Sequence, residues 1–243
     1  MWFSIGVKKF LHSGKSLEES RTSEARSKIS VMDLKKAIVL QERLASKLAI
    51  RWEGGKINLL AGADFGYELK NKKIGAIVVV FTFPELEIVE VSEARRDLKL
   101  PYIPGFLAFR EGPAFFDAFR KIRNKPDITL VDGNGIAHPR RMGLASFIGV
   151  VLNIATIGCA KSPFFPINLP HDKRGAYTIF RNRNREKVGF CLRTRTGVKP
   201  IFVSPGHRID FIRSKQIVLS CSKFRIPEPL REAHRLAQRM FAS

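Results

Sequence analysis

The stretch I-N-L-L-A-G-A-D (residues 57–64) is followed by I-G-A-I-V-V-V-F-T-F (residues 74–83) and then by E-I-V-E-V-S-E (residues 87–93). All three stretches are rich in apolar and β-branched residues, which is typical of strands. Short turn signals separate them, N-K-K at 71–73 and F-P-E at 83–85. Connections this short predict antiparallel hairpins. We therefore expect a meander of three antiparallel strands.

Helical and strand patterns alternate around this meander. A helical spacing of apolar residues runs from Asp33 to Ala49 and includes Gln41, and further helices are predicted over 112–122 and 142–152. Strands are predicted over 127–132 and 155–160. This order predicts an α/β fold with a ribonuclease H-like mixed sheet, in which parallel strands follow the antiparallel meander and helices flank the sheet. We expect a mobile N-terminal tail over 1–30 and one domain over 31–243.

The charge of the chain narrows the class of partner. Lys and Arg number 43 against 22 Asp and Glu, a net charge of +21 that attracts polyanions, of which nucleic acid is the commonest and a membrane surface a weaker alternative. The three cysteines form no C-x-x-C pair, so neither a disulfide framework nor a zinc site is indicated. No apolar run has the roughly 18 residues of a membrane span, and we expect a cytoplasmic protein.

Three carboxylates carry the predicted chemistry. Asp64 and Asp132 each close an apolar run, and on neighbouring strands the two would converge and require a cation. Glu111 is the third candidate, at the start of the helix that follows the meander. An oxygen-only ligand set favours Mg²⁺, with Mn²⁺ as a substitute. Two-metal hydrolysis of a phosphodiester fits such a site.

Basic residues near these carboxylates each have two interpretations. His138 would either orient water or a phosphate, or serve as a structural hydrogen-bonding residue. Lys161 would either stabilise charge at the scissile phosphate or be an ordinary surface lysine. Arg140 and Arg141 grip phosphate or face solvent. His207 assists the metal site or caps the helix that follows it. The sequence leaves these alternatives open.

Four blocks resemble the signature motifs of the endonuclease V family: P-Y-I-P-G-F-L-A-F-R-E-G-P (101–113), D-G-N-G-I-A-H-P-R-R-M-G-L-A-S (132–146), T-I-G-C-A-K-S (156–162) and K-P-I-F-V-S-P-G-H-R (199–208). They stand in the family's order, and the resemblance covers residues 33–235. It implies a ribonuclease H-like fold and a Mg²⁺-dependent DNA repair endonuclease. The implied reaction is a nick at the second phosphodiester bond 3′ to deoxyinosine, the product of adenine deamination, which leaves a 5′-phosphate.

The resemblance also implies roles for individual residues. The metal-binding carboxylates of the family fall on the same three acidic residues, with His138 and Lys161 in support. A wedge aromatic that enters the duplex falls on Tyr102. The residues expected to bind substrate are Tyr102, Ile103, Pro104, Gly105, Leu107 and Gly133.

Two departures from the family pattern and two rival functions remain. The chain has Phe65-Gly66 where the family commonly has a Ser before the Tyr, and Asn134 where a His is usual. These departures bear on substrate preference or metal handling and leave the carboxylates intact.

One rival function is an inosine-specific endoribonuclease acting on RNA, and the other is a non-catalytic nucleic-acid-binding protein, against which the intact carboxylates argue. The expected partner is DNA containing deoxyinosine, bound by a monomer.

Overall fold

A computed structural model describes residues 31–242 of the chain. The N-terminal tail expected over residues 1–30 lies outside the described residues. Within the described part, no helix is long and apolar enough to cross a membrane.

One eight-stranded mixed sheet runs through this region, with the strand order β3-β2-β1-β4-β5-β8-β7-β6. Antiparallel pairing of β1 with β2 and of β2 with β3 confirms the predicted meander. Parallel pairing of β1 with β4 and of β4 with β5 confirms the predicted second part. The strands are β1 (Leu59–Glu68), β2 (Lys73–Thr82), β3 (Ile88–Asp97), β4 (Ile128–Asp132), β5 (Ala155–Ala160), β6 (Tyr177–Arg181), β7 (Lys187–Leu192) and β8 (Ile201–His207).

The C-terminal part of the sheet is antiparallel and was not predicted. Strand β8 pairs with β5, β7 with β8, and β6 with β7. Strand β8 carries Pro205 and Gly206 in its interior, where both residues weaken a strand pattern. This explains why the pattern failed to reveal the strand.

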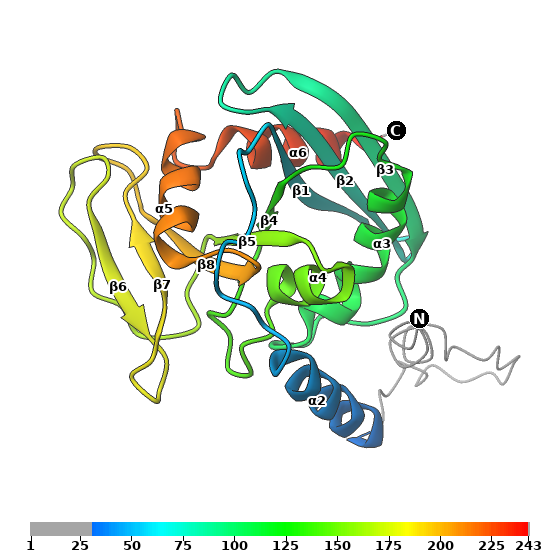
Figure 1. The fold of residues 1–243 in the computed structure, drawn as a ribbon. Coiled ribbons are helices and arrows are strands. Elements are labelled where there is room, and N and C mark those ends of the chain that lie inside the picture. Colours follow the sequence, from blue (N-terminus) through cyan, green and yellow to red (C-terminus); the bar gives the residue numbers. More distant parts are fainter. Residues whose placement is uncertain (1–30, 243) are drawn as a thin grey trace, which may run out of the picture.

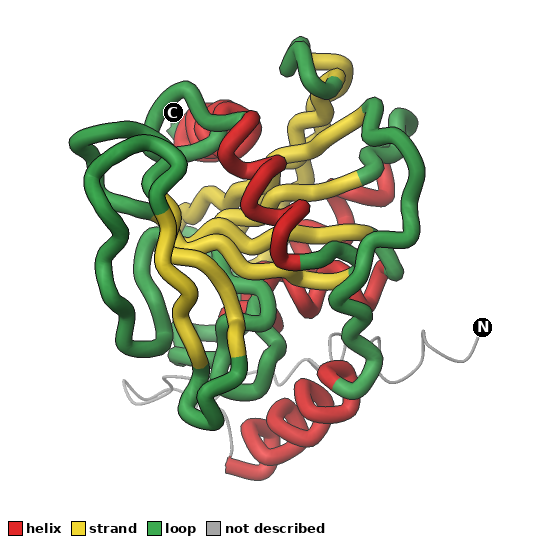
Figure 2. Tube along the Cα trace, turned by 60° about the vertical axis from the view of Figure 1, so that its left-hand side comes forward, coloured by secondary structure: helices red, strands yellow, loops and turns green. Residues whose placement is uncertain are grey.

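Among residues 31–242, four helices cover the two faces of the sheet, and a fifth, α2, packs against α4 outside them (Figures 1 and 2). One face packs against α3 and α4, with α2 beyond them, and the other face packs against α5 and α6. Successive residues of β1 therefore point to opposite layers, because side chains alternate along a strand. The helices are α2 (Val31–Ala45), α3 (Leu107–Lys121), α4 (Leu144–Leu152), α5 (Phe211–Ser220) and α6 (Glu228–Arg239).

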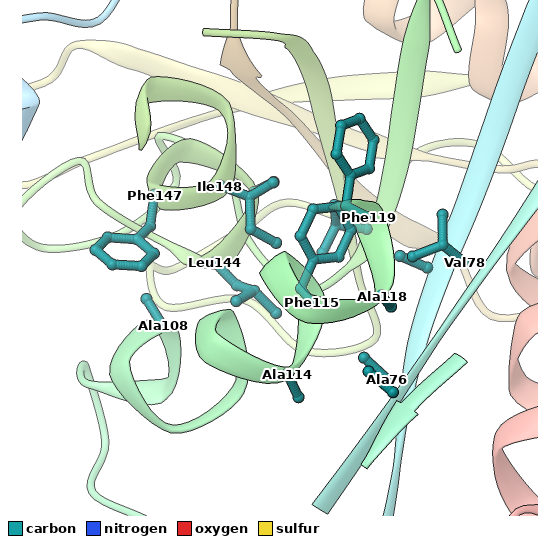
Figure 3. Packing of buried hydrophobic residues seen from close by; sticks show 14 of the residues in the cluster. Ala76, Val78, Ala108, Ala114, Phe115, Ala118, Phe119, Leu144, Phe147 and Ile148 are labelled. Atoms are coloured by element: carbon teal, nitrogen blue, oxygen red, sulfur yellow. The ribbon is translucent and has the colours of Figure 1, made fainter. Parts of the chain in front are cut away.

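Phenylalanines fill the layer between α3, α4 and the meander (Figure 3). Phe115 stacks on Phe119 with ring centroids 5.4 Å apart, and Phe109 meets Phe147 of α4 edge-on at 5.3 Å. Small residues belong to the same buried cluster, among them Ala76 of β2 and Ala114 and Ala118 of α3, so bulky rings and small side chains fill it together (Figure 3). This packing fixes α3, and with it Glu111, relative to the sheet.

Two positional predictions are corrected by the structure. Helix α3 begins at Leu107 and not at residue 112, so Glu111 lies in its second turn and Pro113 lies inside it. Pro113 is therefore an interior proline, although proline in a helix is favoured in the first turn. Asp64 lies in the middle of β1 and does not close it, since β1 continues to Glu68.

Candidate active site

The three predicted carboxylates come together beside the central parallel strands. In the register of β1 and β4, Ala63 lies opposite Val131, so the next residues, Asp64 and Asp132, are neighbours across the pair. Glu111 reaches the same place from α3. All three side chains line one cavity of about 450 Å³, together with Lys161.

Burial and mutual repulsion raise the pKa of two of these carboxyl groups. Glu111 is only 6% exposed, and burial, with a further contribution from the charges of Asp64 and Asp132, raises its pKa to about 8. Burial and the charge of Asp132 raise the pKa of Asp64. Ionised carboxylates held this close and this deeply require a positive partner.

Protein groups now contact each carboxylate. The Tyr67 hydroxyl donates to Glu111, and the Lys161 ammonium pairs with Asp132. Asp64 accepts the Phe65 N–H at 2.8 Å. Within residues 31–242, no group of three or more His, Cys, Asp or Glu side chains is arranged to hold a metal ion. The donors facing the cavity are nevertheless carboxylate oxygens, and this set fits a hard divalent cation better than zinc.

His234 of α6 joins this site and was missed by the sequence analysis. Its Nδ1 lies 2.6 Å from Oδ2 of Asp64, and its Nε2 lies 2.9 Å from the side-chain nitrogen of Gln238, one helical turn further along. The spacing of His234 and Gln238 on one helix face is visible in the sequence. Its relation to Asp64 is not, because 170 positions separate the two residues.

A second cavity of about 280 Å³ adjoins the carboxylate cavity. The two cavities share Tyr102, Leu107, Gly133 and Ser162 in their linings. Tyr102 itself is 65% exposed. Gly105 and His138 line the second cavity, whereas the predicted binding residues Ile103 and Pro104 lie on the same loop and line neither cavity.

His138 uses both of its ring nitrogens in contacts with the protein. The Arg140 N–H donates to Nδ1 at 3.2 Å, so the ring proton lies on Nε2, which faces the Gly105 carbonyl oxygen at 3.1 Å. Burial, with a smaller contribution from the Arg140 charge, lowers the pKa of His138 to about 4. The catalytic role stays a prediction, and these contacts favour the structural alternative for this residue.

His207 fills neither of the roles considered for it. Its Nδ1 accepts the Ala49 N–H at 3.2 Å, and its Nε2 lies 3.3 Å from Oδ1 of Asn153. The following helix, α5, is capped by Asp210, whose Oδ1 accepts the Arg213 N–H at 2.8 Å. His207 therefore ties the segment after α2 to the sheet.

A mixed sheet of this strand order, with a group of carboxylates beside its central parallel strands, defines the class of ribonuclease H-like nucleases. The sequence profile described as Endonuclease V matches residues 33–235. The chain therefore belongs to the endonuclease V family, whose members are metal-dependent nucleases, hydrolases that act on nucleic acids in DNA repair.

Individual relatives agree with this assignment. The chain is 45% identical over 209 residues to the endonuclease V of Trichormus variabilis, a match that covers 85% of this chain and 94% of the relative. The crystal structure of the endonuclease V of Streptomyces avermitilis is similar with a TM-score of 0.81 and 36% identity, over 86% of this chain and 92% of that one. The endonuclease V of Ciona intestinalis, crystallised with a 23mer DNA containing an inosine followed by a ribo-adenosine, has a TM-score of 0.77 and 31% identity, over 86% and 97% of the two chains.

Proposed function

We propose that this chain is a DNA repair endonuclease that recognises deoxyinosine and cleaves the second phosphodiester bond 3′ to it, leaving a 5′-phosphate. The observation that carries the proposal is the pair of adjoining cavities, one lined by carboxylates and the other by Gly105, Leu107 and Met142. A nuclease that acts at a damaged base needs one place for the base and another for the phosphate beside it. The shared lining of Tyr102 and Gly133 supports continuity between the two.

The second cavity suits an extruded purine base. Much of its lining is apolar or glycine, and it includes Leu107 and Ala108 at the start of α3. The first N–H groups of a helix have no partner within the helix, so they are available as donors. Hypoxanthine presents a carbonyl oxygen where adenine presents an amino group, so free N–H groups at the start of α3 would favour hypoxanthine. A deaminated base also pairs weakly, which lowers the cost of extruding it.

The carboxylate cavity suits hydrolysis of the phosphodiester. We propose that Asp64, Glu111 and Asp132 hold Mg²⁺, or Mn²⁺ in its place, which when bound would activate a water and stabilise the leaving oxygen. We propose that Lys161, which pairs with Asp132, neutralises charge on the phosphate. His234 orients the Asp64 carboxylate through its Nδ1 contact of 2.6 Å.

A second candidate function is cleavage of RNA at inosine. The Ciona intestinalis relative was crystallised with a substrate in which a ribo-adenosine follows the inosine. A ribonucleotide at that position places a 2′-hydroxyl near the bond that we propose is cut. A protein contact to this hydroxyl would favour RNA.

One comparison of substrates tests both candidates. Matched oligonucleotides carry deoxyinosine, ribo-inosine, deoxyuridine or an abasic site, and each is incubated with Mg²⁺, with Mn²⁺ or with EDTA. We expect a nick one nucleotide beyond deoxyinosine with either cation and no product in EDTA. Cleavage restricted to ribo-inosine would establish the RNA candidate, and cleavage of none of the substrates would refute nuclease action at inosine.

Asp132→Ala tests the metal assignment. We expect loss of nicking by more than about 100-fold, because the cation loses a ligand, while binding of the inosine duplex is largely retained. Asp172→Ala is the matched control, since Asp172 is an exposed acid that pairs with Arg193 at 3.4 Å and lines neither cavity. Nicking by Asp132→Ala at the parental rate would contradict the assignment.

We also propose that the protein acts as a monomer in the cytoplasm. Cys159, Cys191 and Cys221 are buried free thiols, which suits a reducing compartment. Light scattering of the purified protein tests the monomer, and a mass of twice the 27.5 kDa chain would contradict it.

A further inference from the structure

The carbonyl oxygen of Gly105 is contacted by three side chains, one from α2 and two from the loop between β4 and α4. Nε2 of Gln41, from α2, donates to it at 3.0 Å, and Nη2 of Arg140 donates at 2.9 Å. The protonated Nε2 of His138 is the third donor, at 3.1 Å. We call Gln41, His138 and Arg140 the Gly105 brace.

The members of the Gly105 brace also hold one another. Nε of Arg140 donates to Oε1 of Gln41 at 2.6 Å, and the Arg140 N–H donates to Nδ1 of His138 at 3.2 Å. Gln41 is fully buried on the apolar side of α2, yet both ends of its amide have partners. A buried amide is tolerated only when it is hydrogen-bonded, and an apolar side chain would fill the same space without this requirement. The position of Gln41 therefore indicates a role for its hydrogen bonds.

The brace acts on the loop that carries Tyr102. Gly105 has a φ of +81°, a conformation suited to glycine, and it ends the loop just before α3 begins. The Arg140 guanidinium also covers the Phe106 ring, 4.7 Å from its centroid. At the other end of the loop, Nη1 of Arg110 donates to the Leu100 carbonyl oxygen at 3.0 Å. The loop is thus held at both ends, with the exposed Tyr102 between them.

We propose that Gln41 and Arg140 are positioning residues, which hold the Gly105 carbonyl so that the Tyr102 loop keeps its shape when it enters the duplex. This inference rests on the function proposed above. A side chain that separates stacked bases must resist displacement, and a preorganised loop loses less conformational freedom on binding than a loose one. Helix α2 thereby contributes to recognition of the lesion although Gln41 lines neither cavity.

The brace should matter only where a base pair has to be opened. Two duplexes with the same flanking sequence separate this role from a general one. In the first, deoxyinosine is paired with cytosine, and in the second it is unpaired in a bulge, so that little work is needed to extrude it. The matched variants are Gln41→Met, which keeps the length and apolar fit of the side chain, Arg140→Met, and the double substitution.

For each single variant we expect an about tenfold lower rate of nicking on the paired substrate, and a rate within about twofold of the parent on the bulged one. The double variant should lose little more than either single variant, because the residues act as one unit. Adding the parent protein should raise the fluorescence of a 2-aminopurine placed beside the lesion, and adding either variant should raise it less. Gln216→Met, an exposed glutamine on α5, is the matched control and should behave as the parent.

Two results would overturn the proposal, and both differ from failure of the proposed function. Equal losses on the paired and bulged substrates would assign the brace a general structural role, and multiplicative losses in the double variant would show that the two residues act separately. A parent protein that cuts neither substrate would refute the proposed function itself. If a thermal unfolding measurement shows that Gln41→Met is not folded, Arg140→Met decides the question. Arg140 is only half-buried, so its replacement disturbs the fold less.

Discussion

Replacing Tyr102 with alanine should impair recognition of the lesion and leave the fold intact. The side chain is 65% exposed, so its removal should change the free energy of unfolding by no more than about 0.5 kcal/mol. Stacking of a base on an aromatic ring contributes about 1–3 kcal/mol. If Tyr102 stacks on a base of the opened duplex, Tyr102→Ala should lower kcat/KM on the inosine duplex by about 5- to 150-fold.

The assay compares nicking of the inosine duplex with binding of an undamaged duplex of the same sequence, measured by gel shift. Tyr102→Phe keeps the ring and should remain close to the parent. Tyr177→Ala is the matched control, because Tyr177 is another exposed tyrosine, on β6, and lines neither cavity.

Two outcomes would refute the reasoning about Tyr102. Equal losses on the inosine and undamaged duplexes would mean that Tyr102 serves general binding and not lesion recognition. A loss in Tyr102→Phe as large as that in Tyr102→Ala would mean that the hydroxyl group matters and that stacking by the ring does not.

Two further predictions concern α6 and the sheet. His234→Ala should lower the nicking rate about 10- to 100-fold with little change in Tm, because His234 contacts Asp64. His207→Ala should lower the free energy of unfolding by about 1–3 kcal/mol and leave the nicking rate per folded molecule unchanged. The reverse pattern would mean that His207 serves the reaction and His234 the fold. Gly62→Ala would place a Cβ 2.1 Å from the Pro229 carbonyl oxygen of α6, so urea unfolding should show a loss of about 1–3 kcal/mol. Gly55→Ala, with nothing within 4 Å, should be neutral, and equal effects of the two substitutions would contradict close packing of α6 on β1.

Local patterns predicted the first half of the sheet and the carboxylates. The meander was predictable because β1 and β2 are continuous apolar runs separated by short turns, so each strand pairs with its neighbour in sequence. Asp132 was predictable because an apolar strand that ends on a carboxylate is itself a local signal. The parallel register of β1 and β4 bears out the expectation that Asp64 lies beside Asp132, although Asp64 lies inside β1 and not at its end.

The start of α3 differs from the prediction. The helix is predicted from residue 112, whereas the apolar face of α3 extends back through Phe109 and Ala108. Packing against α4 and β2 outweighs the lost hydrogen bond at the proline. Tertiary contacts therefore decided where the helix begins.

By itself, the sequence determined the first five strands of the mixed sheet, the charge that attracts nucleic acid and the identity of the three carboxylates, because these follow from residue type and short-range order. Only the tertiary structure decided which side chains contact the carboxylates and the loop beside them. His234 reaches Asp64 across 170 positions, and Gln41 reaches Gly105 across 64. No local period encodes such contacts, because they depend on how α6 and α2 pack on opposite sides of the sheet.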